Sequence, residues 1–354
     1  MGGLVVIDPI VIVVLLAGSV LGWVTYRVVR RRRRLLGRCA AALTVAFALL
    51  AAGDVVNAHF AYLPRVSDVV GVPSWPTIKA ADVLPAPARG RVRVRRRGAV
   101  LTLPLPAPRS GFARHTAMVY LPPQYFTEPG RRFPVVYLLH GSPGASIDWF
   151  RADRASDVGL AAAEAGTPLI LVAPTVSRRW SDDSECVDSP HERIETFLTA
   201  DVLPDVDRAL RTLPVRRARA LAGNSAGGYC ALNLGLRHRD LFATIIDLSG
   251  YTSPTHDGGL RALFGHGHDL AHRVAANTPA QYAAQLHTQP RVQLWLDSGR
   301  ADHRPRRDLS SIAPVLRSRG QDVTLQLRPG AHDHNVWRPA LRQAILWAAP
   351  KLSR

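Results

Sequence analysis

The chain has 354 residues, enough for one large domain with an extension or for two domains. A hydrophobic fraction of 47% suits a globular core, and the formal net charge is +18. No recognised nucleic-acid-binding module or run of interleaved basic and aromatic residues accompanies this charge, which argues against nucleic-acid binding. Nearly all the basic residues are arginine, which we attribute to a GC-rich genome; attraction to anionic lipid headgroups is the alternative.

Residues 1–63 predict a membrane anchor. Pro9 to Tyr26 is apolar and uncharged, and a second apolar stretch runs from Leu35 through Gly53 and continues less cleanly past Asp54 to Leu63. Each is close to the ~20 residues that span a bilayer. The arginine-rich loop between them belongs in the cytoplasm by the positive-inside rule. We therefore expect two transmembrane helices in the cell membrane and an extracytoplasmic domain. A cleaved signal peptide is the weaker interpretation, because no basic region precedes the first apolar run.

Residues 64–90 contain five prolines and little periodicity, which predicts a Pro-rich linker. Residues 91–354 are then expected to form the folded domain. It opens with short alternating runs, among them Val92–Arg95 and Ala117–Leu121, which predict strands.

From Phe133 onward, apolar strand patterns alternate with helical patterns. The expected strands are Pro134–His140, Pro168–Ala173, Ala218–Ala222, Ala243–Leu248, Val292–Leu296 and Val323–Leu327. The expected helices are Ala155–Ala165, Glu192–Arg211 and Asn335–Leu352. This alternation predicts an α/β fold with a mostly parallel sheet covered by helices on both faces. Residues 251–288 interrupt the alternation and are candidates for a cap.

The stretch from Ala220 to Cys230 contains Gly223-x-Ser225-x-Gly227, with an apolar lead-in typical of a strand and a follow-on typical of a helix. A serine at such a strand-to-helix turn has a strained backbone, so side chains two residues away on either side would clash. Its hydroxyl lies at a helix N-terminus, where backbone N–H groups stabilise negative charge. We interpret Ser225 as a nucleophile.

A serine nucleophile needs a base, and the base needs an acid that orients it. In this architecture the acid and then the histidine follow the serine along the chain. The predicted strand ending at Leu296 is followed by Asp297 and Asp302, and the last predicted strand is followed by His332 and His334. We assign Asp302 as the acid and His332 as the base, with Asp297 and His334 as the alternatives.

The oxyanion that develops in acyl transfer needs two hydrogen-bond donors. One is the N–H of the residue after the nucleophile, Ala226. The second is expected in the loop Gly141-Ser142-Pro143-Gly144, which follows a predicted central strand. Because Pro143 has no N–H, Ser142 is the better donor.

Three further groups of residues leave alternatives open. Cys186 and Cys230 could pair in an extracytoplasmic domain, or remain two separate buried thiols. The loop with Trp180, Asp182, Asp183 and Glu185 lines the substrate entrance and recognises a cationic group, or is simply a solvated acidic loop. For His266, His268 and His272 we favour exposed cap histidines over a metal site with Asp269, and we expect no metal and no cofactor.

The soluble part resembles the esterase family of α/β-hydrolases that includes esterase D, feruloyl esterases and the antigen 85 mycolyltransferases. The resemblance covers residues 110–340. It rests on Ser110-Gly-Phe, Val119-Tyr-Leu-Pro-Pro123, Tyr137-Leu-Leu-His-Gly141, Gly223-Asn-Ser-Ala-Gly-Gly228, Gly299-Arg-Ala-Asp302 and Gly330-Ala-His332 with Trp337. The resemblance implies an α/β-hydrolase fold with a Ser225–Asp302–His332 triad acting on esters, and it favours His332 over His334.

These observations predict a membrane-anchored serine esterase acting on a lipid or cell-envelope ester, among which an aminoacylated phospholipid is one hypothesis. An acyltransferase with the same triad is the first alternative, since both reactions share the acyl-enzyme step. A catalytically silent binding protein on a hydrolase fold is the second.

Overall fold

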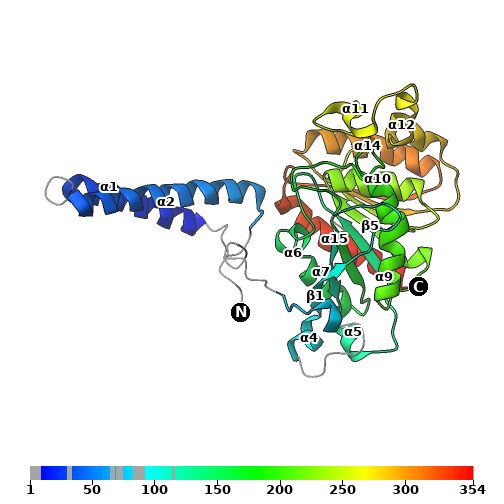
Figure 1. Cartoon of the computed structure of the whole chain (residues 1–354), viewed down its shortest axis with the longest axis horizontal. Coiled ribbons are helices and arrows are strands. Elements are labelled where there is room, and N and C mark those ends of the chain that lie inside the picture. Colours follow the sequence, from blue (N-terminus) through cyan, green and yellow to red (C-terminus); the bar gives the residue numbers. More distant parts are fainter. Residues whose placement is uncertain are drawn as a thin grey trace. The chain divides into compact units, whose positions relative to one another are not determined.

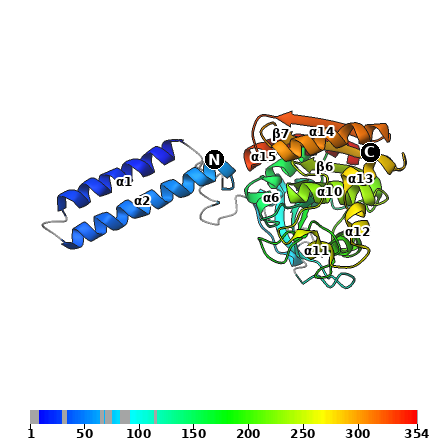
Figure 2. The same ribbon diagram turned by 90° about the horizontal axis from the view of Figure 1, so that it is seen from above.

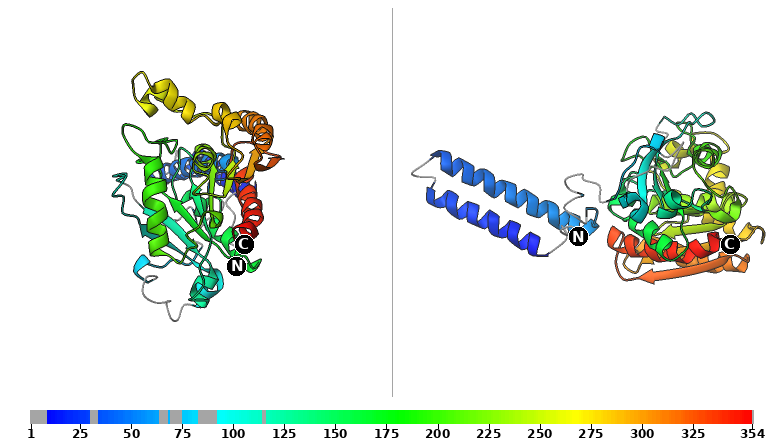
Figure 3. Two further views of the ribbon diagram at one scale, coloured as in Figure 1. Left: turned by 90° about the vertical axis from the view of Figure 1, so that its right-hand side faces the viewer. Right: turned by 90° about the horizontal axis from the view of Figure 1, so that it is seen from below.

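The computed structural model describes residues 9–29, 34–63, 68, 75–82, 92–113 and 116–353. Residues 30–33 of the predicted arginine-rich loop and most of the predicted linker therefore lie outside the described residues. The chain divides into two compact units, Met1–Ser74 and Trp75–Arg354, and Figures 1 to 3 show the ribbon of each.

The first unit consists of two helices in contact, α1 (Pro9–Val29) and α2 (Arg34–Phe60). Small residues of α1 allow close packing. A Cβ at Gly18 would lie 3.0 Å from the Phe47 ring, and Ser19 Oγ donates to the Thr44 carbonyl at 3.3 Å. Within α2, Arg34–Ala58 is long and apolar enough to cross a membrane, whereas the apolar part of α1, Val13–Val28, is shorter.

The second unit is built on an eight-stranded sheet with the order β1-β2-β4-β3-β5-β6-β7-β8. Only the pairs β1–β2 and β2–β4 are antiparallel; every other neighbouring pair is parallel. The strands are β1 (Ala99–Pro104), β2 (Thr116–Leu121), β3 (Val135–Leu139), β4 (Ile170–Pro174), β5 (Arg219–Asn224), β6 (Thr244–Leu248), β7 (Gln293–Gly299) and β8 (Asp322–Arg328).

The helices of this unit include several short segments. They are α4 (Val92–Arg97), α5 (Pro123–Thr127), α6 (Asp148–Arg151), α7 (Ala155–Glu164), α8 (Ile194–Thr196), α9 (Leu203–Ala209), α10 (Ala226–Arg237), α11 (Gly259–Phe264), α12 (Leu270–Ala276), α13 (Pro279–Tyr282), α14 (His303–Ser318) and α15 (His334–Leu352). Short 3-10 turns cover Ala80–Asp82, Arg216–Ala218 and Ala283–Gln285, and a π-helical turn covers Phe197–Val202.

Alternate residues of the central strands enter two hydrophobic cores, because successive side chains of a strand point to opposite faces. In β3, Tyr137 packs in the core that holds residues of α10 and α14, whereas Leu138 packs in the core that holds residues of α7 and α15. Helices therefore cover both faces of the sheet, as the sequence predicts, and Figure 1 shows α10 and α15 against it.

Two predicted elements differ from the structure. Val92–Arg95 was expected as a strand but belongs to α4, in which Val94 is buried while Arg95, Arg96 and Arg97 are exposed. Gly98, with φ of 71°, ends this helix, and the first strand starts only at Ala99. A left-handed φ of this kind favours glycine.

The single helix expected over Glu192–Arg211 is three consecutive pieces, α8, the π-helical turn and α9. Pro204 near the start of α9 has no N–H to continue the α-helical ladder, which accounts for the wider turn before it.

Part of the predicted linker belongs to the second unit. Trp75 and Ile78 are buried in its two cores. The Val100 N–H donates to the Pro76 carbonyl at 2.8 Å, and the Ile78 N–H donates to the Val100 carbonyl at 3.1 Å. Residues 75–78 therefore add an extended segment beside β1.

The contact between β5 and α10 is too close for side chains. A Cβ at Gly223 would overlap the Gly227 carbonyl, and a Cβ at Gly227 would overlap the Leu139 carbonyl of β3. Backbone atoms of a central strand cannot move away without breaking the sheet, so glycine is required at both positions.

Replacing Gly227 with alanine should therefore destabilise the domain by about 3 kcal/mol, since overpacking against backbone cannot be relieved by a rotamer change. The measurement is the free energy of unfolding in urea. Gly130→Ala is the matched control, because nothing lies within 4 Å of its added Cβ. Equal stabilities of the two variants would contradict the close contact.

Asp247 of β6 is fully buried, and its Oδ1 accepts the Gly250 N–H at 2.6 Å. Burial away from water raises the pKa of this carboxyl to about 8, and the nearby Asp297 carboxylate adds to the rise. The group is therefore protonated in the folded domain at neutral pH.

A raised pKa in the folded state means that the folded domain binds more protons than the unfolded chain between about pH 4 and pH 8. Asp247 thus contributes stability at low pH that is lost as the pH rises through this window. Asp247→Asn should gain stability relative to the wild type from pH 5 to pH 8, measured by urea unfolding. The exposed Asp322→Asn serves as control. A constant difference between Asp247→Asn and wild type across this range would disprove the assignment.

Candidate active site

Ser225 lies between β5 and α10 with φ of 54° and ψ of −123°. Such a conformation costs a non-glycine residue about 1–3 kcal/mol and persists only where the surroundings enforce it. Here the Ser225 N–H donates to the Leu248 carbonyl at 2.9 Å, and the Ser225 carbonyl accepts from the N–H of Gly228 at 2.9 Å. The turn expected from the glycine spacing is therefore present.

Three loops at the carboxyl ends of parallel strands bring Ser225, His332 and Asp302 together. His332 Nε2 lies 2.8 Å from Ser225 Oγ, and His332 Nδ1 lies 2.8 Å from Asp302 Oδ2. Asp302 is buried, whereas 42% of the His332 side chain is exposed to solvent. A neutral imidazole in this position donates Nδ1–H to the carboxylate and accepts the hydroxyl proton at Nε2.

The two alternative residues are bound elsewhere. Asp297 is buried and accepts from Arg328 Nε at 2.7 Å and from Trp295 Nε1 at 3.1 Å. His334 is buried with its Nδ1 2.8 Å from Asp153 Oδ1. Both residues therefore have structural partners within the fold.

The loop that follows β3 approaches the start of α10. Gly141, Ser142 and Ala226 line one small cavity of about 10 Å³. The first N–H groups of a helix have no partner inside the helix, so the Ala226 N–H at the start of α10 is available to a ligand. Ser142 precedes a cis peptide bond to Pro143, and its hydroxyl donates to the Asp182 carbonyl at 3.2 Å.

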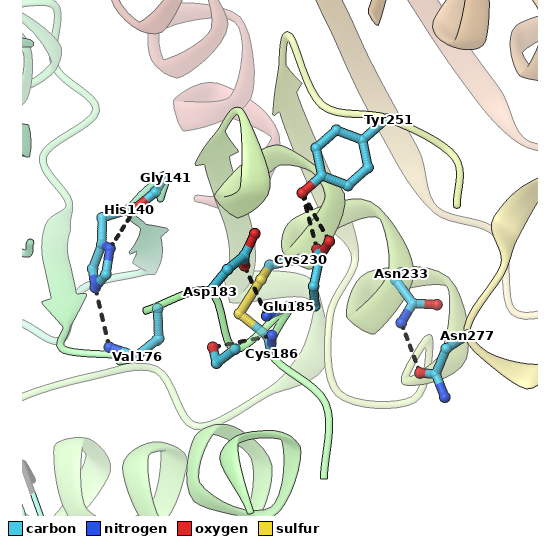
Figure 4. The surroundings of a disulfide bond; sticks show 11 residues. His140, Gly141, Val176, Asp183, Glu185, Cys186, Cys230, Asn233, Tyr251 and Asn277 are labelled. Atoms are coloured by element: carbon cyan, nitrogen blue, oxygen red, sulfur yellow. Dashed lines mark hydrogen bonds between the residues drawn. A yellow bond between two sulfur atoms is a disulfide. The ribbon is translucent and has the colours of Figure 1, made fainter. Parts of the chain in front are cut away.

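His140 fixes the backbone of this loop, a role that sequence reasoning did not identify. Its Nε2 accepts the Val176 N–H at 3.2 Å, so its Nδ1 carries the proton that is donated to the Gly141 carbonyl at 2.9 Å. Burial lowers the pKa of His140, which keeps the ring neutral and this pair of bonds intact. Figure 4 shows the ring between the two segments.

A larger cavity of about 340 Å³ opens beside the loop that contains the predicted entrance residues. Asp182, Asp183, Glu192 and Asp257 line it, together with Arg178. Burial raises the pKa of Asp183 to about 6. The hydrogen bond that Asp183 Oδ1 accepts from the Glu185 N–H lowers the pKa and partly opposes this rise. The lining of this cavity is therefore predominantly acidic above that pH.

Glu185 does not line this larger cavity, although the sequence placed it with Asp182 and Asp183. It is 1% exposed, and its carboxylate accepts from Tyr251 Oη at 3.0 Å and from Thr255 Oγ1 at 2.8 Å. Glu185 thus joins its loop to the segment that follows β6. Trp180, by contrast, is exposed.

A disulfide joins Cys186 of this loop to Cys230 of α10, which resolves the pairing that the sequence left open. Figure 4 shows the bond beside Asp183 and Glu185. The two cysteines are separated by 44 residues, and Ser225 lies between them, so the disulfide closes a covalent loop that contains Ser225.

The segment expected as a cap folds into the short helices α11 to α13. Leu263 and Phe264 of α11 pack with Val187 in a small core of their own. His266, His268 and His272 are exposed. Among the residues that the structure describes, no group of three or more His, Cys, Asp or Glu side chains is arranged to hold a metal ion.

The model of the family described as putative esterase matches residues 113–348. An uncharacterised protein of Corynebacterium glutamicum is 28% identical over 250 residues, which cover 68% of this chain and 58% of the relative. An esterase of Mycobacterium tuberculosis is 34% identical over 143 residues, covering 40% of this chain and 30% of the relative.

Among solved structures, a ferulic acid esterase aligns with a TM-score of 0.60 at 24% identity, covering 72% of this chain and 98% of that one. This likeness shows an α/β-hydrolase fold. The chain spans about a third to somewhat over half of the length of the first two relatives. Since the family model covers most of the second unit, the chain belongs to the putative esterase family.

Proposed function

We propose that this chain is a serine esterase that works through an acyl-enzyme. The observation that carries the proposal is the continuous hydrogen-bond chain from Ser225 Oγ through His332 to Asp302, with both distances at 2.8 Å. Membership of the esterase family supports it. A binding protein on the same fold would not need this arrangement on a strained turn.

In the proposed reaction, His332 Nε2 takes the Ser225 hydroxyl proton while Oγ attacks the ester carbonyl carbon. Asp302 accepts the Nδ1–H and stabilises the imidazolium. The N–H groups of Ala226 and Ser142 are assigned to the oxyanion. The tetrahedral intermediate expels the alcohol, which leaves with the proton from His332. Water, deprotonated by the same ring, then attacks the acyl-serine and releases the carboxylic acid.

An acyltransferase is the second candidate, because a hydroxyl group of a lipid or sugar can replace water in the last step. The exposure of the His332 side chain favours neither, since it admits water as well as a larger alcohol. Product analysis with and without an added sugar or glycerol acceptor separates the two reactions: only a transferase forms a new ester.

We further propose that α1 and α2 anchor the enzyme in the cell membrane with the catalytic domain outside. The apolar length of α2 supports this placement, and so does the arginine-rich sequence between the helices. The Cys186–Cys230 disulfide agrees with an oxidising compartment. In that position the substrate is a lipid or an ester of the cell envelope.

We call the loop Gly141-Ser142-Pro143-Gly144 the oxyanion loop. The acidic cavity beside it supports a substrate with a positive charge near the ester. An aminoacylated phospholipid carries its ammonium group on the carbon next to the ester carbonyl, within reach of a neighbouring acidic surface. Asp182 and Asp183 each line both the small and the large cavity. Asp183 is the residue to test, because its pKa of about 6 lets its charge be changed with pH.

Ser225→Ala should reduce ester turnover by about 10⁶-fold, the effect of removing a triad serine. The measurement is hydrolysis of a chromogenic short-chain ester by the purified protein. Ser311→Ala, on the exposed surface of α14, should retain wild-type turnover. The proposed function is wrong if Ser225→Ala remains as active as this control.

Alanyl-phosphatidylglycerol in vesicles should be cleaved in preference to its N-acetylated form, which lacks the charge. Asp183→Asn should reduce that preference by about tenfold, the value of one charge-assisted hydrogen bond. In the wild type the preference should rise as the pH increases through about 6, where Asp183 becomes ionised.

The control for this experiment is Asp240→Asn, an exposed residue between α10 and β6 at the opposite edge of the sheet. If Asp183→Asn keeps the wild-type preference, the acidic cavity does not determine which lipid is cleaved. If the wild type cleaves both lipids equally, the enzyme does not recognise the ammonium group.

A further inference from the structure

We infer that Asp153, His334 and Asn224 form a positioning chain. This chain fixes the loop that carries His332 relative to Ser225. The inference rests on the proposed roles of Ser225 and His332. None of the three residues of the chain is assigned to the reacting atoms.

The chain links three separate segments. Asp153, between α6 and α7, has its Oδ1 2.8 Å from His334 Nδ1 at the start of α15. Its Oδ2 accepts from Asn224 Nδ2 at 3.4 Å, at the end of β5. All three residues are buried, and Asp153 is 0% exposed. A carboxylate removed from water this completely is stable only while its hydrogen bonds are made, so it fixes the two donors that reach it.

The two ends of the chain lie next to the proposed catalytic groups. Asn224 directly precedes Ser225, and His334 follows His332 by two residues. The rings of both histidines meet Trp337 edge-on, each at a centroid distance of 4.9 Å. A shift of His334 therefore alters both the backbone and the ring contact that orient His332.

Asn224 also borders the oxyanion loop. A Cβ built on Gly141 would lie 3.3 Å from Ser225 Cβ and 3.5 Å from Asn224 Oδ1. The Asn224 side chain thus lies between Asp153 and the loop that carries Ser142. One buried carboxylate is in this way connected to the segments of the nucleophile, the base and the proposed oxyanion donors.

An exchange of amide and carboxylate tests the chain. Asn224→Asp places two carboxylates against each other, and their repulsion should displace the turn that carries Ser225. The double variant Asn224→Asp with Asp153→Asn restores the pairing with the donor and acceptor reversed, because the new amide accepts from His334 and donates to the new carboxylate. Gln321→Leu is the control: it removes a buried hydrogen bond to the Val292 N–H at the amino ends of β7 and β8, far along the strands from Ser225.

For Asn224→Asp we expect kcat for a chromogenic ester to fall by about 10²-fold, the effect of a misplacement near 1 Å, with KM unchanged. The double variant should recover most of this loss, and Gln321→Leu should lower the unfolding temperature without changing kcat. A folded Asn224→Asp variant with wild-type kcat would overturn the chain. A folded double variant no faster than the single one would do the same.

These outcomes are separate from those for the proposed function, which depends on Ser225→Ala. If turnover requires Ser225 but the double variant does not recover kcat, the proposed function is retained and the positioning chain is rejected. If turnover survives in Ser225→Ala, both proposals are withdrawn.

Discussion

The backbone of Ser225 is held at a positive φ that most residues with a side chain avoid, and the rest of the site is arranged around it. The turn is enforced from several sides, by the bond of its N–H to Leu248 and by the contact of α10 with β3 and β5. That contact is only possible because Gly223 and Gly227 lack side chains. The stability of the central parallel sheet offsets the strain of the Ser225 backbone. The strained conformation places the Ser225 hydroxyl at the start of a helix.

Around this turn, buried polar groups order the loops that a parallel sheet leaves at its carboxyl edge. His140 fixes the loop after β3. Glu185 joins the loop that contains Trp180 and Asp183, the predicted entrance loop, to the segment after β6. The Cys186–Cys230 disulfide ties that entrance loop to α10. Loops bury little hydrophobic surface, so hydrophobic packing alone does not fix their conformation. Buried hydrogen bonds and one disulfide fix it here.

Ser225, Asp302 and His332, which the structure brings within hydrogen-bond distance, are the proposed site residues that have a local sequence signature. The turn at Ser225 needs glycine at fixed offsets from the serine. Asp302 and His332 follow predicted strands, and parallel strands end at one edge of the sheet. The sequence could not show that Asp297 is bound by Arg328, since that ion pair depends on the register of β7 and β8. Nor could it place Glu185 in a buried network with Tyr251, 66 positions away.

The arginine-rich run at Val92–Arg97 alternates like a strand, but the edge of the sheet is already filled by β1 and by residues 75–78.

Mass-spectrometric mapping of the residue modified by a fluorophosphonate tests the account most directly. Such a reagent reacts far faster with a hydroxyl that a neighbouring base has activated than with other side chains. We expect a single adduct on the peptide that contains Ser225, formed in the wild type and not in His332→Gln. An adduct on another residue, or equally fast modification of Ser225 in His332→Gln, would contradict it.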